Sequence, residues 1–239
     1  MVIALTILLY ANFTSASTIL ASCIEKTPPF CYQSEGKPQG FLVDILSEIS
    51  KRMSVDIIIT PLPAKRLLLN MKTGEIHIAM PIVFSKDRAN HIHFLSSTVM
   101  TVRMGLYGFE KNRFNFQRIE NLFGKTIAIR NGYYVSKAYT SAVEAGKIKV
   151  VVTKSDEQLI QLVSKERVKY VLMPNVSFAK YAASSEIVRY GVLGKPIGTK
   201  VGVSKQSWLY KDHHRVDDAF LDMIHDGTLA NLEKKYGIH

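Results

Sequence analysis

The sequence predicts an α/β protein of two lobes, with the second lobe inserted into the first. Short apolar segments alternate with amphipathic segments of about 10–15 residues, which is typical of βαβ units around mostly parallel sheets. This alternation is interrupted at the polar stretch Glu110–Asn115 and then begins again. Near Gly194–Val203 the chain turns back through a proline and a glycine before its last helical segments.

In the first part of the chain, β-branched or apolar runs bounded by turn residues predict strands at Thr18–Cys23, Val55–Thr60 and Ile76–Pro81. Apolar residues at helical spacing predict one helix from Phe41 to Met53 and another at Pro63–Lys72. A long mixed segment, Thr98–Phe109, is expected to be a strand that leads out of the first lobe.

The same alternation predicts the second lobe and the end of the chain. Strands are expected at Lys125–Arg130, Lys149–Thr153, Val168–Met173 and Gly194–Val203. Helices are expected at Val135–Ala145, Ser155–Ser164 and Val176–Ala183. An apolar stripe from Val216 to Ile224, followed by a break at Asp226-Gly227-Thr228, predicts two consecutive helices at the C-terminal end.

The first sixteen residues, MVIALTILLYANFTSA, are uncharged, and their apolar run ends in small residues. We interpret residues 1–16 as a signal peptide that is cleaved, although a positively charged n-region is missing. A membrane anchor is the weaker interpretation, because a spanning helix needs ~20 predominantly apolar residues. The mature protein is therefore expected to be exported to the periplasm.

Cys23 and Cys31 are the only cysteines. In an oxidising compartment an even pair of cysteines favours a disulfide, here one that closes a short loop, and two separate thiols are the alternative. A third reading is lipidation, since Leu20-Ala21-Ser22-Cys23 fits a lipoprotein cleavage site. Cleavage there would remove the predicted first strand, so we prefer the strand.

The formal net charge is +11, from 31 Lys and Arg against 20 Asp and Glu. Such a charge permits nucleic acid, an anionic membrane surface or an acidic ligand as partner. A basic stretch with interleaved aromatic residues, at residues 111–118, comes closest to a nucleic-acid site. In an exported protein this stretch fits the rim of the second lobe better, so we expect no nucleic-acid partner.

The sequence carries no recognised catalytic motif and no histidine spacing that suits a metal. We therefore expect no enzyme activity, no catalytic residues, no metal and no cofactor.

Four segments, taken in order, resemble the bacterial family 3 extracellular solute-binding proteins, the amino-acid-type binding proteins of ABC importers. The segments are spread over nearly the whole chain after the predicted signal peptide. They are Thr27-Pro28-Pro29-Phe30 with Gly40-Phe41-Leu42-Val43-Asp44; Phe84-Ser85-Lys86-Asp87-Arg88 with Phe94-Leu95-Ser96; Leu122-Phe123-Gly124-Lys125; and Ile224-His225-Asp226-Gly227-Thr228.

The resemblance implies a type II periplasmic-binding-protein fold, with two lobes that close like a hinge on a small molecule. The crossings between lobes are expected near Gly108–Lys111 and Ile197–Val201. The first lobe would comprise residues 17–108 and 200–239, and the second lobe residues 109–199. A monomer is expected, and its protein partner would be an inner-membrane ABC permease or a sensor protein.

The resemblance also implies that Arg88 holds the α-carboxylate of the ligand, since a guanidinium binds a carboxylate through two parallel hydrogen bonds. The alternative is a surface arginine beside Asp87. The preceding segment departs from the family pattern, because Met80, Pro81 and Val83 make that wall apolar. Proline also has no amide hydrogen to offer a carboxylate.

In the second lobe the family places small hydroxyl residues after a glycine, whereas this chain has Gly132-Tyr133-Tyr134. Arg130 is a further candidate for the cleft, with a solvated strand end as the alternative. The acid that the family uses for the ligand's amino group is missing from the matching segment, which ends in Asn175.

Two more candidates complete the expected ligand site. Thr27 stands where many members carry an aromatic ring, and Arg66 belongs to a Pro-x-x-Arg pattern of divergent branches. The expected site therefore gains arginine and tyrosine and loses its acid. This favours a carboxylate-bearing anionic or aromatic solute over a free amino acid. The resemblance implies a protein that captures a small polar solute, an amino acid or a related carboxylate, between two closing lobes for an ABC importer. The alternatives are a ligand-sensing module without a transport role and a dehydratase-like enzyme of the same superfamily.

Overall fold

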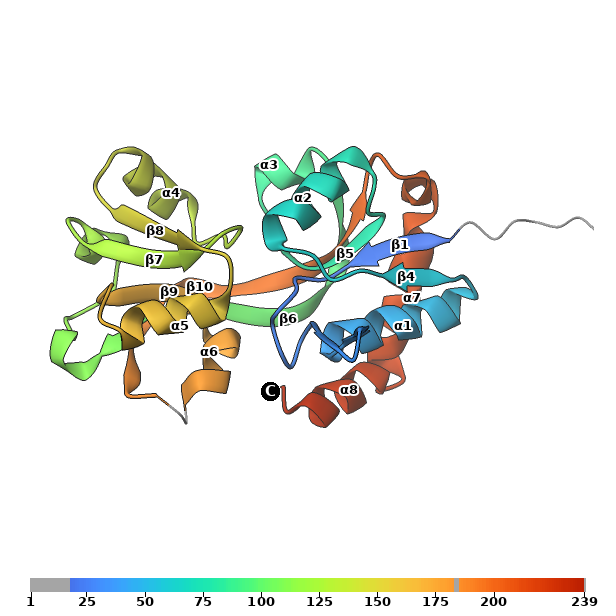
Figure 1. The fold of residues 1–239 in the computed structure, drawn as a ribbon. Coiled ribbons are helices and arrows are strands. Elements are labelled where there is room, and N and C mark those ends of the chain that lie inside the picture. The colour runs from blue at the N-terminus through green and yellow to red at the C-terminus, as the bar shows by residue number, and fades with distance from the viewer. Residues whose placement is uncertain (1–17, 183–184, 239) are drawn as a thin grey trace, which may run out of the picture.

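The computed structural model describes residues 18–182 and 185–238, so the predicted signal peptide lies outside the described residues. Figure 1 shows two α/β lobes side by side, with two long strands running from one lobe into the other. These strands are β6 (Ile92–Phe109) and β10 (Ile187–Ser204). They belong to a sheet of order β4-β1-β5-β10-β6-β9-β7-β8, which continues through both lobes.

The first lobe holds one end of this sheet and the helices on its two faces. Its strands are β1 (Ile19–Ser22), β4 (Ile57–Ile59) and β5 (Ile78–Val83), together with the short ribbon of β2 (Tyr32–Ser34) and β3 (Lys37–Gln39). Its helices are α1 (Phe41–Met53), α2 (Ala64–Thr73), α3 (Lys86–Ala89), α7 (His213–His225) and α8 (Thr228–Tyr236). Strand β1 pairs in parallel with both β4 and β5.

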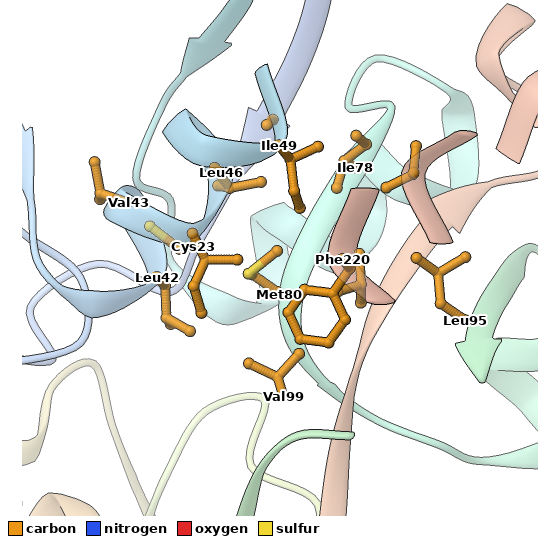
Figure 2. Packing of buried hydrophobic residues seen from close by; sticks show 14 of the residues in the cluster. Cys23, Leu42, Val43, Leu46, Ile49, Ile78, Met80, Leu95, Val99 and Phe220 are labelled. Carbon is orange, nitrogen blue, oxygen red and sulfur yellow. The ribbon is translucent and has the colours of Figure 1, made fainter. Parts of the chain in front are cut away.

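The core of the first lobe lies between the sheet and helices α1 and α7 (Figure 2). Leu42, Leu46 and Ile49 project from α1 toward Phe220 of α7, at the helical spacing that the sequence shows. Helix α1 begins at Phe41, directly after Gly40, where a Cβ would lie 2.5 Å from the backbone oxygen of Phe30. This close approach explains why glycine precedes the helix.

The second lobe holds the other end of the sheet. Its strands are β7 (Thr126–Arg130), β8 (Lys149–Thr153) and β9 (Tyr170–Pro174), and its helices are α4 (Lys137–Glu144), α5 (Asp156–Ser164) and α6 (Asn175–Ala182). Ser136 and Ser155 cap α4 and α5, each accepting a hydrogen bond from a backbone N–H of the first turn.

The lobes are connected where β6 and β10 exchange neighbours. The two strands pair with each other from Ile92 with Ser204 to Phe109 with Ile187. Within β10, Thr199–Val203 also pairs with β5, whereas Met104–Tyr107 of β6 pairs with β9. The predicted lobe limits stay predictions.

Cys23 and Cys31 form a disulfide across eight positions of sequence, with Cα atoms 6.1 Å apart. Both cysteines are fully buried in the core of the first lobe. The loop that they close carries Thr27 and Phe30, which reach the cavity described below. Among the described residues, no helix combines the length and apolar character needed to cross a membrane.

Candidate functional site

A cavity of about 90 Å³ lies where the two lobes meet. Both lobes and the crossing strands contribute side chains to its wall. The lining residues are Ile24, Thr27, Phe30, Leu42, Pro81, Val83, Arg88, Met100, Val102, Met104, Gly132, Tyr133, Tyr134, Pro174, Val176, Ser177 and Thr199. Most are apolar, and none of these described lining residues is acidic.

Arg88 is the cation of this cavity. It lies in the short helix α3, whose first turn is fixed because Ser85 accepts a hydrogen bond from the Arg88 N–H at 3.3 Å. The half-buried side chain donates from Nη1 to the Val83 carbonyl oxygen at 2.9 Å. Burial lowers the pKa of the guanidinium, with Tyr134 and Asp87 opposing that shift. Within the described chain Arg88 forms no ion pair, so its charge remains available to a ligand.

The second lobe faces Arg88 with the turn that follows β7. Gly132, at φ +84°, lies against the first turn of α2, where a Cβ would be 2.6 Å from Ala64 Cβ. The Tyr134 ring centroid is 5.9 Å from the Arg88 guanidinium carbon, which is a cation–π distance. The lobes are therefore in direct contact around the cavity.

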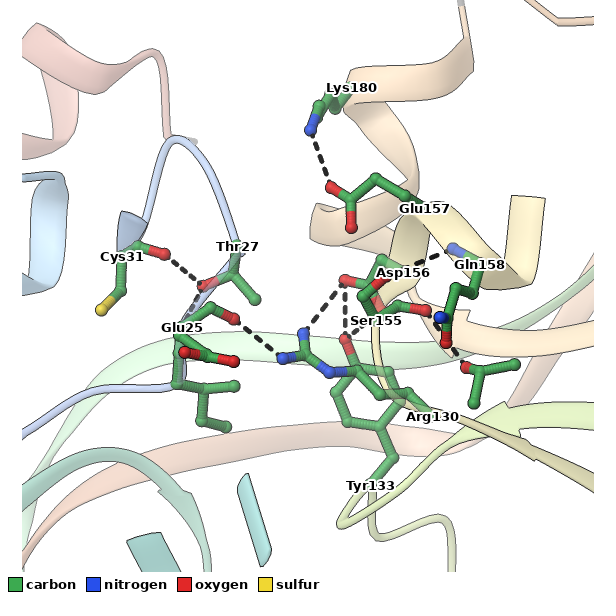
Figure 3. A network of polar contacts seen from close by, with 12 residues as sticks. Glu25, Thr27, Cys31, Arg130, Tyr133, Ser155, Asp156, Glu157, Gln158 and Lys180 are labelled. Carbon is green, nitrogen blue, oxygen red and sulfur yellow. Dashed lines mark hydrogen bonds and ion pairs between the residues drawn. The ribbon is translucent and has the colours of Figure 1, made fainter. Parts of the chain in front are cut away.

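Behind Tyr133 lies a buried polar network (Figure 3). The Tyr133 hydroxyl lies 2.8 and 2.9 Å from the two carboxylate oxygens of Asp156. Arg130 Nη1 is 3.6 Å from Asp156 Oδ2, with both side chains almost fully buried. Burial raises the pKa of Asp156, and the charge of Arg130 and the Tyr133 hydrogen bond only partly oppose this. Burial likewise raises the pKa of Tyr133.

The structure brings together five of the residues singled out from the sequence: Thr27, Arg88, Gly132, Tyr133 and Tyr134 line one cavity. The Thr27 hydroxyl is also engaged locally, donating to the Ile24 carbonyl oxygen at 2.7 Å.

Four other residues from that set do not line the cavity. Arg130 lies behind Tyr133 in the network, and Met80 is buried in the core of the first lobe. Asn175 begins α6, and its Oδ1 accepts a hydrogen bond from the Arg103 N–H at 2.7 Å. Arg66 is exposed on α2.

Sequence reasoning missed Asp156 and the α6 residues Val176 and Ser177. Asp156 follows Ser155, a recognisable helix cap, but a first-turn aspartate is common at helix starts and gives no signal of its own. Its significance comes from Tyr133, which is 23 residues away in sequence. No three His, Cys, Asp or Glu side chains are grouped to hold a metal within residues 18–182 and 185–238.

Comparison with known proteins gives the family. The model of the bacterial extracellular solute-binding proteins, family 3, matches residues 20–239. The chain is also similar to the probable amino-acid-binding protein YxeM of Bacillus subtilis (strain 168). The two are 23% identical over 218 residues, which cover 87% of this chain and 79% of that protein.

Two solved structures show the same fold. An ancestral arginine-binding protein bound to arginine matches with a TM-score of 0.79 and 18% identity, over 92% of this chain and 97% of that one. A histidine kinase sensor domain with similarity to periplasmic binding proteins matches with a TM-score of 0.80 and 16% identity, over 92% and 95% of the chains. These likenesses confirm the predicted type II fold.

Proposed function

Because the chain belongs to the bacterial extracellular solute-binding proteins of family 3, we propose that it captures a small carboxylate between its lobes for an ABC importer. One observation supports a carboxylate as the ligand. Arg88 reaches a cavity lined by both lobes and has no acidic partner among the described residues. A guanidinium in this setting binds a carboxylate through charge-assisted hydrogen bonds.

The same cavity disfavours an α-ammonium group. Burying a cation without an acceptor is costly, and no described lining residue supplies a carboxylate. Asp156 lies behind Tyr133 on the second lobe, and the Tyr133 hydroxyl contacts both of its carboxylate oxygens. Pro174, at the end of β9, lines the cavity without any side-chain acceptor. The ligand is therefore an acid without an α-amine.

The remaining wall suits a carbon skeleton. Phe30, Leu42, Met100, Val102 and Met104 present apolar side chains to the cavity. Pockets of this kind bind the body of a ligand through apolar contact and orient it with few polar groups. Arg88 supplies that orientation here.

Thermal unfolding with added acetate, propionate, lactate, benzoate and free amino acids tests the proposal. A ligand at 100 times its Kd adds ~2.7 kcal/mol to stability. We expect a shift with acetate, propionate and lactate, which lack an α-amine, and none with the free amino acids. Arg88→Ala should abolish the shift, whereas Arg167→Ala, at an exposed arginine that does not line the cavity, should retain it. An undiminished shift in Arg88→Ala would contradict the proposal.

A ligand-sensing role is the second candidate, favoured by the likeness in fold to a histidine kinase sensor domain. Import and sensing use the same closing lobes, so the membrane partner separates them. Cross-linking in intact cells supplied with the solute would capture a permease under the import proposal. Capture of a sensor protein in its place would favour sensing.

A further inference from the structure

A second space lies next to the cavity. A groove of about 750 Å³ runs beside the turn of β10, and its wall includes Phe84, Arg118 and Lys195. Tyr134 lines both this groove and the cavity that contains Arg88. Its side chain is therefore positioned as a partition between a small space and a large one.

The size of the cavity makes this partition important. An engineered apolar cavity of about 150 Å³ holds benzene, and the cavity beside Arg88 has only about 90 Å³. With Tyr134 in its present position, we expect the wall to exclude an aromatic acid from the space beside Arg88. The cavity instead matches a short aliphatic acid. A longer acid that keeps its carboxylate on Arg88 would have to extend past Tyr134 into the groove.

The Tyr134 side chain is half-buried and faces the Arg88 guanidinium. Its hydroxyl makes no hydrogen bond to any other described residue, in contrast to the Tyr133 hydroxyl, which bonds to Asp156. The ring makes a cation–π contact with Arg88. A carboxylate on Arg88 and the Tyr134 ring thus meet at the same guanidinium.

We propose that Tyr134 determines specificity by size, closing the cavity against acids longer than a short aliphatic chain and separating it from the groove. This inference rests on the proposed function, because it takes a carboxylate on Arg88 as given. Removing the ring joins the two spaces. The groove then becomes a subsite for the apolar part of an arylalkyl carboxylate.

Calorimetric titration with propionate and 3-phenylpropionate tests the proposal. We expect the unmodified protein to bind 3-phenylpropionate at least about tenfold more weakly than propionate, since a closed wall excludes the larger acid. Tyr134→Ala should remove or reverse that preference. Tyr134→Phe should keep it, because the ring and not the hydroxyl forms the partition. Tyr32→Ala is the matched control, since Tyr32 is half-buried and lines neither space.

The possible failures can be distinguished. If Tyr134→Ala binds propionate and keeps the original preference, the size proposal is overturned and the carboxylate function stands. Equal affinity of the unmodified protein for both acids would also overturn the size proposal and leave the carboxylate function standing. If neither acid binds to the unmodified protein or to Tyr134→Ala, the proposed function and the size proposal are both overturned.

Discussion

Nη2 of Arg130, at the end of β7, donates a hydrogen bond of 2.8 Å to the backbone carbonyl oxygen of Glu25 in the first lobe. The contact joins the two lobes through protein atoms alone. Nη1 of the same guanidinium has no hydrogen-bond partner among the described residues and lies 3.6 Å from Asp156 Oδ2. Arg130 therefore links the two lobes and, at the same time, places a positive charge beside a buried acid.

Arg130→Met should strongly destabilise the protein. Removing one partner of a buried ion pair leaves an uncompensated charge, which typically costs about 3–5 kcal/mol. The double variant Arg130→Met/Asp156→Asn should recover part of this loss, because the remaining polar group is neutral. Urea unfolding measures the free energy of unfolding of the single and the double variant. If the free energy of unfolding of Arg130→Met lies within ~1 kcal/mol of the parent, the pair of Arg130 and Asp156 contributes little to stability.

The pH dependence of stability should report on Asp156. Burial raises its pKa in the folded protein, so the folded state binds its proton more tightly than the unfolded state does. The resulting stability is fully present below the unfolded carboxyl pKa and is lost as pH rises through the folded pKa. Asp156→Asn removes that loss. The stability of Asp156→Asn relative to the parent should therefore increase as pH rises from about 4 to 7.

Other carboxyl groups also titrate in this range, so the comparison needs a control. Asp226 is exposed, and hydrogen bonds from Thr228 and Arg52 lower its pKa to about 2. Asp226→Asn should therefore lack the increase that Asp156→Asn shows between pH 4 and 7. A stability difference for Asp156→Asn that is flat or falls with pH would contradict the assigned direction.

Most strands and helices inside each lobe could be predicted from the sequence, because their apolar periodicity is local; the short elements β2, β3 and α3 were not predicted. Strand β8 was expected at Lys149–Thr153 and is found there. The crossing strands were not fully predicted: β6 begins at Ile92 and β10 at Ile187, both earlier than expected. These strands stabilise each other over their whole length, and glycines and a proline interrupt their own pattern.

The residues of the candidate site also fall into those that local sequence patterns predict and those that they do not. Arg88 and the turn Gly132-Tyr133-Tyr134 could be found from short motifs that resemble a family. The contacts of Arg130 could not, since Glu25 lies 105 residues away and Asp156 belongs to helix α5. Such pairing depends on how the lobes are placed, which no local pattern encodes.

Lobe closure should depend on the absence of a side chain at residue 132. Gly132→Ala places a Cβ 2.6 Å from Ala64 Cβ across the cleft. Gly124→Ala is the matched control, since Gly124 also has a positive φ, +74°, and has nothing within 4 Å of its added Cβ. Both variants should lose about 1–2 kcal/mol of stability from left-handed backbone strain.

Only Gly132→Ala should also bind propionate more weakly, by about tenfold. This corresponds to a loss of ~1.4 kcal/mol in binding free energy, because the added Cβ disfavours the form in which the lobes touch. Calorimetry on both variants gives the comparison. Equal affinities would mean that the contact between Gly132 and Ala64 has no part in the binding form.

The disulfide should contribute to stability and to the site. Closing a loop of this length contributes about 2–3 kcal/mol in the chain-entropy account. Cys23→Ala/Cys31→Ala should lose that amount in urea unfolding. Because the closed loop carries Thr27 and Phe30, affinity for propionate should fall as well. A double variant with unchanged stability would show that the surrounding core alone holds the loop.

The most direct test of the account compares propionate with alanine, which share a carboxylate and three carbons and differ by the α-amine. Calorimetric titration of the unmodified protein measures the affinity for both compounds under one set of conditions. A cavity with Arg88 and no described acidic lining residue should bind alanine at least about tenfold more weakly than propionate. Tighter binding of alanine would contradict the account and show that the site keeps an acceptor for the amine.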